Sequence, residues 1–87
     1  MVNYLMKGSI YGFARKVHEV LGYTINTNIS NNVNYISIMA NGRLVELESS
    51  TQIPRYIRGK GVEPREETEL LETLAKNNLI IKREENQ

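Results

Sequence analysis

The chain has 87 residues, 40% of them hydrophobic, and its 11 lysines and arginines nearly balance its 10 acidic residues. A chain of this length hides only roughly 60% of the surface that it exposes when unfolded, so we expect one small domain with a thin core. This size excludes a two-domain enzyme. The formal net charge of +1 is too small to attract nucleic acid or a membrane surface through a bulk field, so an electrostatic function needs local clustering of charge.

The N-terminal residues and the cysteine content both favour a cytoplasmic protein. Residues 1–7 lack the apolar stretch of a signal peptide, and no segment approaches the apolar length that spans a membrane. The absence of cysteine agrees with a reducing compartment. Asparagine is common and aspartate is absent, a bias typical of an AT-rich genome. This composition and the short length suit the small accessory proteins of phages and mobile elements.

Residues 9–21 show the clearest helical pattern in the chain. Ser9 is suited to the N-cap position, where a hydroxyl accepts a bond from an early backbone N–H, and Gly22 is suited to the left-handed position that ends a helix. The spacing of the apolar residues predicts an amphipathic helix. Its buried stripe comprises Ile10, Phe13, Ala14, Val17, Val20 and Leu21.

Between Tyr23 and Ser50 the hydrophobic period changes to two, which predicts three β-strands. Asn31-Asn32 and Asn41-Gly42 indicate two-residue hairpin turns, and these turns fix the register of an antiparallel meander. One face then carries the apolar residues Ile25, Thr27, Ile29, Ile36, Ile38, Val45 and Leu47. The reverse face is predicted to be solvated, with almost no positive charge, and carries Tyr35, Met39 and Leu44 among polar residues.

The C-terminal half adds a loop, a helix and a short strand. Residues 49–63 show neither the helical periodicity nor the period of two typical of strands, and they contain proline and glycine. This pattern predicts a flexible loop. Pro64 suits the first position of a second helix, which buries Leu70, Leu71 and Leu74 and ends at Asn77-Asn78. Residues 79–82 indicate a short strand at an edge of the sheet, and residues 83–87 a frayed charged tail.

These elements predict a single small α+β domain spanning residues 1–87. Its order is a helix, a three-stranded antiparallel meander, a second helix and a short C-terminal strand. Both helices are expected to pack on the apolar face of the meander.

The inventory of chemically active residues predicts that the chain is not an enzyme. His18 is the sole histidine, and the chain has no cysteine or aspartate to orient it. We therefore expect no catalytic residues, no metal site and no cofactor. The glutamates of residues 63–72 are interpreted as a solvated helix face. Gly59-Lys60-Gly61 lacks the spacing of a phosphate-binding loop.

Residues 54–61 form the most distinctive segment, because three cations, an aromatic residue and two glycines fall within eight positions. Its cations could neutralise phosphates while Tyr56 stacks on a base and the glycines allow close approach of the backbone. In the competing interpretation, Ile53, Tyr56 and Ile57 pack beneath the loop as a small satellite cluster and the cations only keep it soluble. The sequence favours the second interpretation because the net charge is so small.

We therefore expect a non-catalytic module that binds another protein, such as a phage or mobile-element inhibitor or regulator of a host protein. The alternative is a small nucleic-acid-binding protein, with Lys7, Arg15, Lys16, Arg55, Arg58 and Lys60 as a composite basic surface. Self-association through a sheet edge or the reverse face is compatible with either. Tyrosine and arginine are enriched at interface hot spots. The expected partner-binding residues lie in the loop or on the reverse face, and are Arg55, Tyr56, Arg58, Lys60, Tyr35, Met39 and Leu44.

Overall fold

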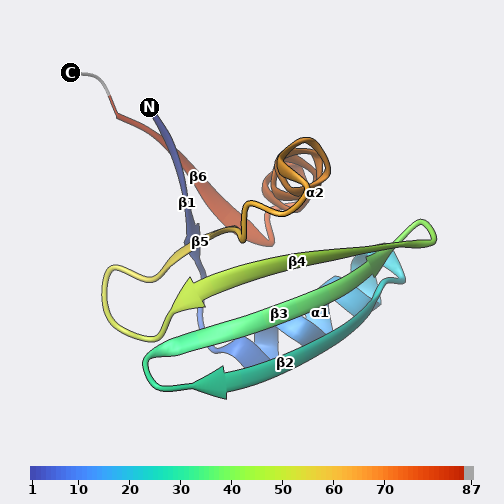
Figure 1. Ribbon diagram of the computed structural model, residues 1–87, viewed down its shortest axis with the longest axis horizontal. Coiled ribbons are helices and arrows are strands. Elements are labelled where there is room, and N and C mark those ends of the chain that lie inside the picture. The colour runs from blue at the N-terminus through green and yellow to red at the C-terminus, as the bar shows by residue number, and fades with distance from the viewer. Residues whose placement is uncertain (86–87) are drawn as a thin grey trace.

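One antiparallel sheet of six strands, with two helices packed on it, makes up most of the chain in a computed structural model that describes residues 1–85 (Figure 1). The predicted α+β class is confirmed, but the sheet has six strands where the sequence predicted four. The elements in chain order are β1 (Val2–Met6), α1 (Ile10–Leu21), β2 (Thr24–Ser30), β3 (Val33–Ala40), β4 (Arg43–Ser50), β5 (Tyr56–Gly59), α2 (Pro64–Lys76) and β6 (Ile80–Glu84).

The strand order β2-β3-β4-β5-β1-β6 places the first strand of the chain inside the sheet, next to the edge strand β6. β5 and β6 are connected by α2, and β1 lies between them, so these elements form a split β-α-β unit. Figure 1 shows α1 behind β2 and β3, whereas β1 and β6 are steeply inclined to β4. This inclination follows from the twist that strands of L-residues accumulate across a sheet.

The first helix begins and ends as the sequence predicts. The Ser9 hydroxyl oxygen accepts a hydrogen bond from the Gly12 N–H at 3.1 Å, and Gly22 ends the helix with φ 72°. Most of the predicted apolar stripe faces the core. Val20 is an exception, because its side chain is 54% exposed.

Both predicted hairpin turns are confirmed, and so are the strand registers they imply. Ser30 pairs with Val33 across the first turn and Ala40 with Arg43 across the second. Asn31 and Asn41 have positive φ, as tight hairpin turns require. Of the predicted apolar face, the residues of β3 and β4 are buried, whereas those of the edge strand β2 are half-buried or exposed.

The sequence analysis missed two strands, β1 and β5. The predicted loop of residues 49–63 is therefore wrong in part: Ser49 and Ser50 continue β4, and Tyr56–Gly59 form β5. Both missed strands are short. β1 pairs only with the distant strands β5 and β6, whereas β5 pairs with β1 and with the preceding strand β4. β5 is also flanked by Pro54 and Gly61, residues that usually indicate a loop.

The predicted C-terminal strand lies at an edge of the sheet, as expected, but it is longer than predicted. β6 continues to Glu84, and the Glu85 N–H donates to the Met1 carbonyl at 2.8 Å. The prediction of a frayed tail from residue 83 is therefore wrong for residues 83–85, because β1 provides them with a partner strand. Residues 86–87 lie outside the described part of the chain.

Both helices and five of the strands contribute to one hydrophobic core. Its fully buried side chains include Val17 from α1, Leu74 from α2, and Ile38 and Leu47 from the meander. β5 contributes Ile57, which is 1% exposed. The prediction that Ile57 belongs to a satellite cluster is therefore wrong: it packs in the main core, and Ile53 is exposed to solvent.

A buried tyrosine fastens β1 to the second helix. The Tyr4 hydroxyl donates to a Glu72 carboxylate oxygen at 2.6 Å, and the Lys82 ammonium of β6 donates to the same oxygen at 3.0 Å. Burial and the bond to Glu72 raise the pKa of Tyr4 to about 12. The Tyr4 hydroxyl and the Lys82 ammonium hold the pKa of Glu72 below its ordinary value. These bonds join β1, α2 and β6.

The raised pKa of Tyr4 predicts a loss of stability at alkaline pH. The unfolded chain releases the Tyr4 proton near the ordinary pKa of 10.0, and the folded chain releases it at about 12. The stabilisation that comes from this hydroxyl is therefore complete at pH values below the lower pKa, and it declines between the two pKa values. Urea unfolding from pH 9 to about pH 12 should show a steeper decline for the native chain than for Tyr4→Phe. Parallel profiles for the two proteins would contradict the assignment.

Candidate functional site

Both helices pack on one face of the sheet, and the opposite face carries no helix in residues 1–85. We call this surface the open face; it consists of the strand side chains that point away from α1 and α2. Ile36, Leu47 and Ile57 point toward the helices and are buried. Because side chains alternate along a strand, their neighbours Tyr35, Glu48 and Arg58 point outward.

Aromatic and apolar side chains from four strands lie on the open face. Leu5 of β1 is the direct cross-strand neighbour of both Tyr56 in β5 and Ile81 in β6. Tyr35 of β3 and Arg58 of β5 flank Glu48 of β4 in the next row of side chains. We call Leu5, Tyr35, Tyr56, Arg58 and Ile81 the tyrosine patch. Tyr56 is 36% exposed and Ile81 is 42% exposed, so the patch offers a substantial apolar surface to solvent.

Charges of both signs surround the patch. The Arg58 guanidinium lies 3.7 Å from a Glu48 carboxylate oxygen, and the Lys60 ammonium lies 5.1 Å from the centre of the Tyr35 ring. Arg83 of β6 adds a further cation and pairs with Glu85 at 3.0 Å. The predicted meander itself contributes no lysine or arginine to this face, as expected, and the cations belong to β5, to β6 and to Lys60.

Two hollows in the open face flank Tyr56 and Arg58. A hollow of about 250 Å³ lies toward β3 and β4 and is also lined by Val33 and Glu48. Another, of about 280 Å³, lies toward β1 and is also lined by Asn3. Tyr56 and Arg58 therefore stand between two recesses of the surface.

Met39 and Leu44 form a separate apolar pair at the far end of the open face. They are direct cross-strand neighbours beside the Asn41-Gly42 turn, and Leu44 is 60% exposed. Met39 lies four residues from Tyr35 along β3, which corresponds to roughly 13 Å in a strand. The structure thus places Met39 and Leu44 on the predicted face but outside the tyrosine patch.

Arg55 does not join Tyr56 and Arg58. Its guanidinium donates to the Gly8 carbonyl, and its own carbonyl accepts from the Met6 N–H at 2.9 Å. These bonds direct it to the junction between β1 and α1, because it precedes β5 by one residue and points to the other side of the sheet. The sequence prediction that Arg55 acts with its neighbours as one contact surface is therefore wrong.

The predicted composite basic surface is divided between the two sides of the molecule. Arg15 and Lys16 lie on α1, which covers one face of the sheet, whereas Arg58 points outward on the opposite face. Lys7 lines a hollow beside Lys16, and its ammonium donates to the Asn78 carbonyl at 2.8 Å. The sheet itself separates these cations, so they do not converge on one ligand.

The glycines of residues 59–61 accommodate a buried glutamate. The Glu67 carboxylate accepts hydrogen bonds from the N–H groups of Gly61, Val62 and Glu63 at 3.0 to 3.1 Å. Glu67 is 4% exposed, so the prediction that it belongs to a solvated face is wrong. A β-carbon at Gly59 would lie 2.6 Å from the β-carbon of Glu67. Gly59 thus makes room for a side chain that joins β5 to α2.

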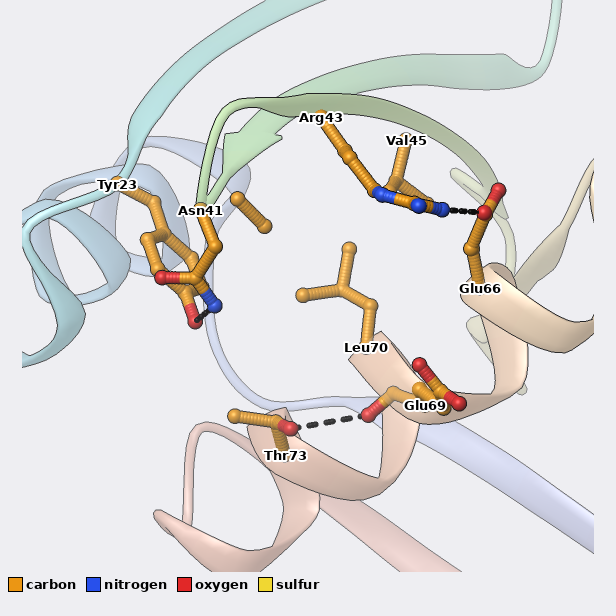
Figure 2. A pocket seen from close by; sticks show the side chains of 9 residues that line it. Tyr23, Asn41, Arg43, Val45, Glu66, Glu69, Leu70 and Thr73 are labelled. Carbon is orange, nitrogen blue, oxygen red and sulfur yellow. Dashed lines mark hydrogen bonds and ion pairs between the residues drawn. The ribbon is translucent and has the colours of Figure 1, made fainter.

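A further hollow of about 280 Å³ lies between the β3–β4 turn and α2 (Figure 2). Leu70 and Val45 form its apolar part, while Arg43 pairs with Glu66 across its opening. On the opposite side the Asn41 amide donates to the Tyr23 hydroxyl at 3.4 Å. The Arg43–Glu66 pair connects the turn to α2. The volume is below the roughly 300 to 1,000 Å³ typical of ligand pockets.

Searches for other kinds of site and for related proteins identify no further candidate. Residues 1–85 contain no group of three or more histidine, cysteine or acidic side chains arranged to hold a metal ion. Within the same residues no helix has the length and apolar character needed to cross a membrane. No family model matches the chain, and neither the curated proteins nor the solved structures contain a significant match.

Leu5, Ile81 and Arg83 are parts of the candidate surface that the sequence analysis did not identify. The runs Tyr4-Leu5-Met6 and Leu79-Ile80-Ile81 carry a usable signal, because alternate residues of a strand point to opposite faces. A strand with three consecutive apolar residues must therefore present at least one on each face. Applied to both ends of the chain, this rule predicts apolar side chains on the reverse face.

Replacing Gly59 tests whether this glycine serves Glu67. Gly59→Ala should lower the free energy of unfolding by about 1–3 kcal/mol, because the added methyl overlaps Glu67 and α2 must shift. Urea denaturation measures the change. Lys60→Ala, at the next and exposed position, is the control and should change stability by less than about 1 kcal/mol. Equal stability of Gly59→Ala and the native chain would show that Glu67 does not require the glycine.

Proposed function

We propose that this chain is a non-catalytic module that binds another protein through the tyrosine patch. The observation that carries the proposal is the convergence of Tyr35, Tyr56 and Arg58 with Leu5 and Ile81 on one helix-free face. Sequence analysis treated the segment around Tyr56 and the face around Tyr35 as alternative contact sites. Because β5 pairs with β4, both segments lie on the same face of the sheet, with Glu48 of β4 between Tyr35 and Arg58.

The chemistry of the patch suits a protein partner. Tyrosine and arginine supply large, rigid contact area and are the residues most enriched at interface hot spots. Here they are mounted on paired strands, so little conformational entropy is lost when they are bound. The nearby ion pair Arg58–Glu48 and the cation Lys60 give the rim both signs of charge, which favours a partner of mixed charge over a polyanion.

The proposed biological role is inhibition or regulation of a host protein by a small phage or mobile-element protein acting in the cytoplasm. The support is compositional: a short chain without cysteine, without aspartate and rich in asparagine. Binding alone suffices for such a role, because a rigid surface that covers a working site on its partner blocks that site without chemistry.

Affinity capture with two matched variants tests the proposal. Immobilised native protein is incubated with lysate of the source organism, and retained proteins are identified and titrated. Tyr56→Ala combined with Arg58→Ala should weaken retention of a specific partner by at least tenfold, since hot-spot truncations cost about 2 kcal/mol or more. Tyr11→Ala combined with Arg15→Ala removes the same residue types from exposed positions of α1 and should retain the partner.

The thermal midpoints of both variants are measured first, so that lost binding is not confused with unfolding. Arg58 is exposed and Glu48 is half-buried, and the two lie 3.7 Å apart, so removal of this surface pair should change stability by about 1 kcal/mol or less. Partner retention that is equal for the native chain and the Tyr56/Arg58 variant would remove the patch from the interface.

Titration with nucleic acid tests the alternative of a nucleic-acid-binding protein. Because the basic side chains are divided between two sides of the sheet, labelled single- and double-stranded DNA and RNA should show no salt-dependent binding from roughly 50 to 200 mM salt. Fluorescence anisotropy measures this directly. Binding that weakens steeply with salt and is lost in Arg58→Ala would instead support the alternative.

A further inference from the structure

The outer edge of β2 lacks the features that normally prevent strands from pairing between molecules. β2 lies at one end of the sheet, with β3 on one side and no described strand on the other (Figure 1). Residues 22–42 contain no charged side chain and no proline. β6, at the opposite edge, carries Lys82, Arg83 and Glu84. Natural proteins usually protect exposed edges with charge, proline, bulges or short strands, and only the β6 edge is protected in this way.

The register of the first hairpin determines which backbone groups β2 presents at that edge. Ser30 and Val33 flank a two-residue turn, so they form a hydrogen-bonded pair and the even-numbered residues of β2 bond to β3. The N–H and C=O groups of Ile25, Thr27 and Ile29 consequently point away from β3. This row of donors and acceptors can accept another strand.

The sequence of β2 is complementary to itself around Thr27. In an antiparallel pair of two β2 strands centred on this residue, Thr27 faces Thr27 of the second copy and Ile25 faces Ile29 of the second copy. On the other face Asn26 lies opposite Asn28 of the second copy. All are favourable or neutral cross-strand pairs, and no like charges meet.

We infer that two copies of this chain associate through β2, around a two-fold axis at Thr27, and join their sheets into one. In this register Ile25, Thr27 and Ile29, whose backbone groups point away from β3, pair only with one another. Each pair exchanges both backbone hydrogen bonds. Ile29, which is 56% exposed in the single chain, becomes covered by Ile25 of the second copy. The tyrosine patch lies on other strands, so this inference does not depend on the proposed function.

Mass measurement with charge variants tests the dimer. Light scattering after size exclusion should give twice the chain mass of 10.0 kDa at high protein concentration. Asn26→Lys with Asn28→Lys places lysines opposite each other across the axis and should give the single-chain mass. An equimolar mixture with Asn26→Glu/Asn28→Glu should restore the dimer. Met39→Lys with Leu44→Lys, on β3 and β4 and so not at the outer edge of β2, is the control and should remain dimeric.

A cysteine crosslink tests the register, since the native chain contains no cysteine. Thr27→Cys brings the two cysteines together across the axis, with α-carbons about 5.5 Å apart, and should form a disulfide-linked dimer under mild oxidation. Thr24→Cys on the same strand separates the two cysteines by roughly 20 Å and should not crosslink. A single-chain mass at all concentrations, equal crosslinking of both variants, or a dimer that persists in the lysine variant would overturn the inference.

Discussion

The insertion of β1 between β5 and β6 is the constraint on which the rest of this structure depends. Without β1, β6 would have no partner strand, and β5 would pair only with β4 over Leu47–Ser49. The buried hydroxyl of Tyr4 strengthens the insertion, because its bond to Glu72 also fixes α2 over the strands. The same strand carries Leu5 on its other side. One five-residue segment thus closes the core and completes the tyrosine patch.

The sequence predicts those parts of the fold that are determined locally. Ser9 and Gly22 mark the ends of α1. The turns at Asn31 and Asn41 determine which residues pair between neighbouring strands of the meander. β1 is different, because both of its partner strands, β5 and β6, lie far away in the chain, and β5 follows β4 without a recognisable turn motif. The periodicity of a segment does not identify a pairing partner that lies far away in the sequence. Such contacts are non-local, so forming them carries a cost in loop-closure entropy.

The candidate surface was predicted in its residue types but not in its geometry. Tyr56 and Arg58 were expected in a loop, and the structure places them on β5, which is separated from the strand of Tyr35 by β4. Arg55 is excluded from this surface by the alternation of side chains along the chain, which directs it toward Gly8. Gly59, interpreted as a residue that lets a ligand approach the backbone, instead admits the carboxylate of Glu67. The alternation of side chains can be applied only to a segment that is known to be a strand, and β5 was predicted to be part of a loop.

Nuclear Overhauser contacts of Leu5 test the central constraint most directly. Leu5 faces Tyr56 on one side and Ile81 on the other, at cross-strand distances of roughly 4.5–5.5 Å between β-carbons. In a spectrum of the isotope-labelled full chain, the Leu5 methyl groups should therefore show contacts to both the Tyr56 ring and the Ile81 methyl groups. Contacts to only one of them, or to neither, would contradict the insertion of β1 and with it the assembly of the tyrosine patch.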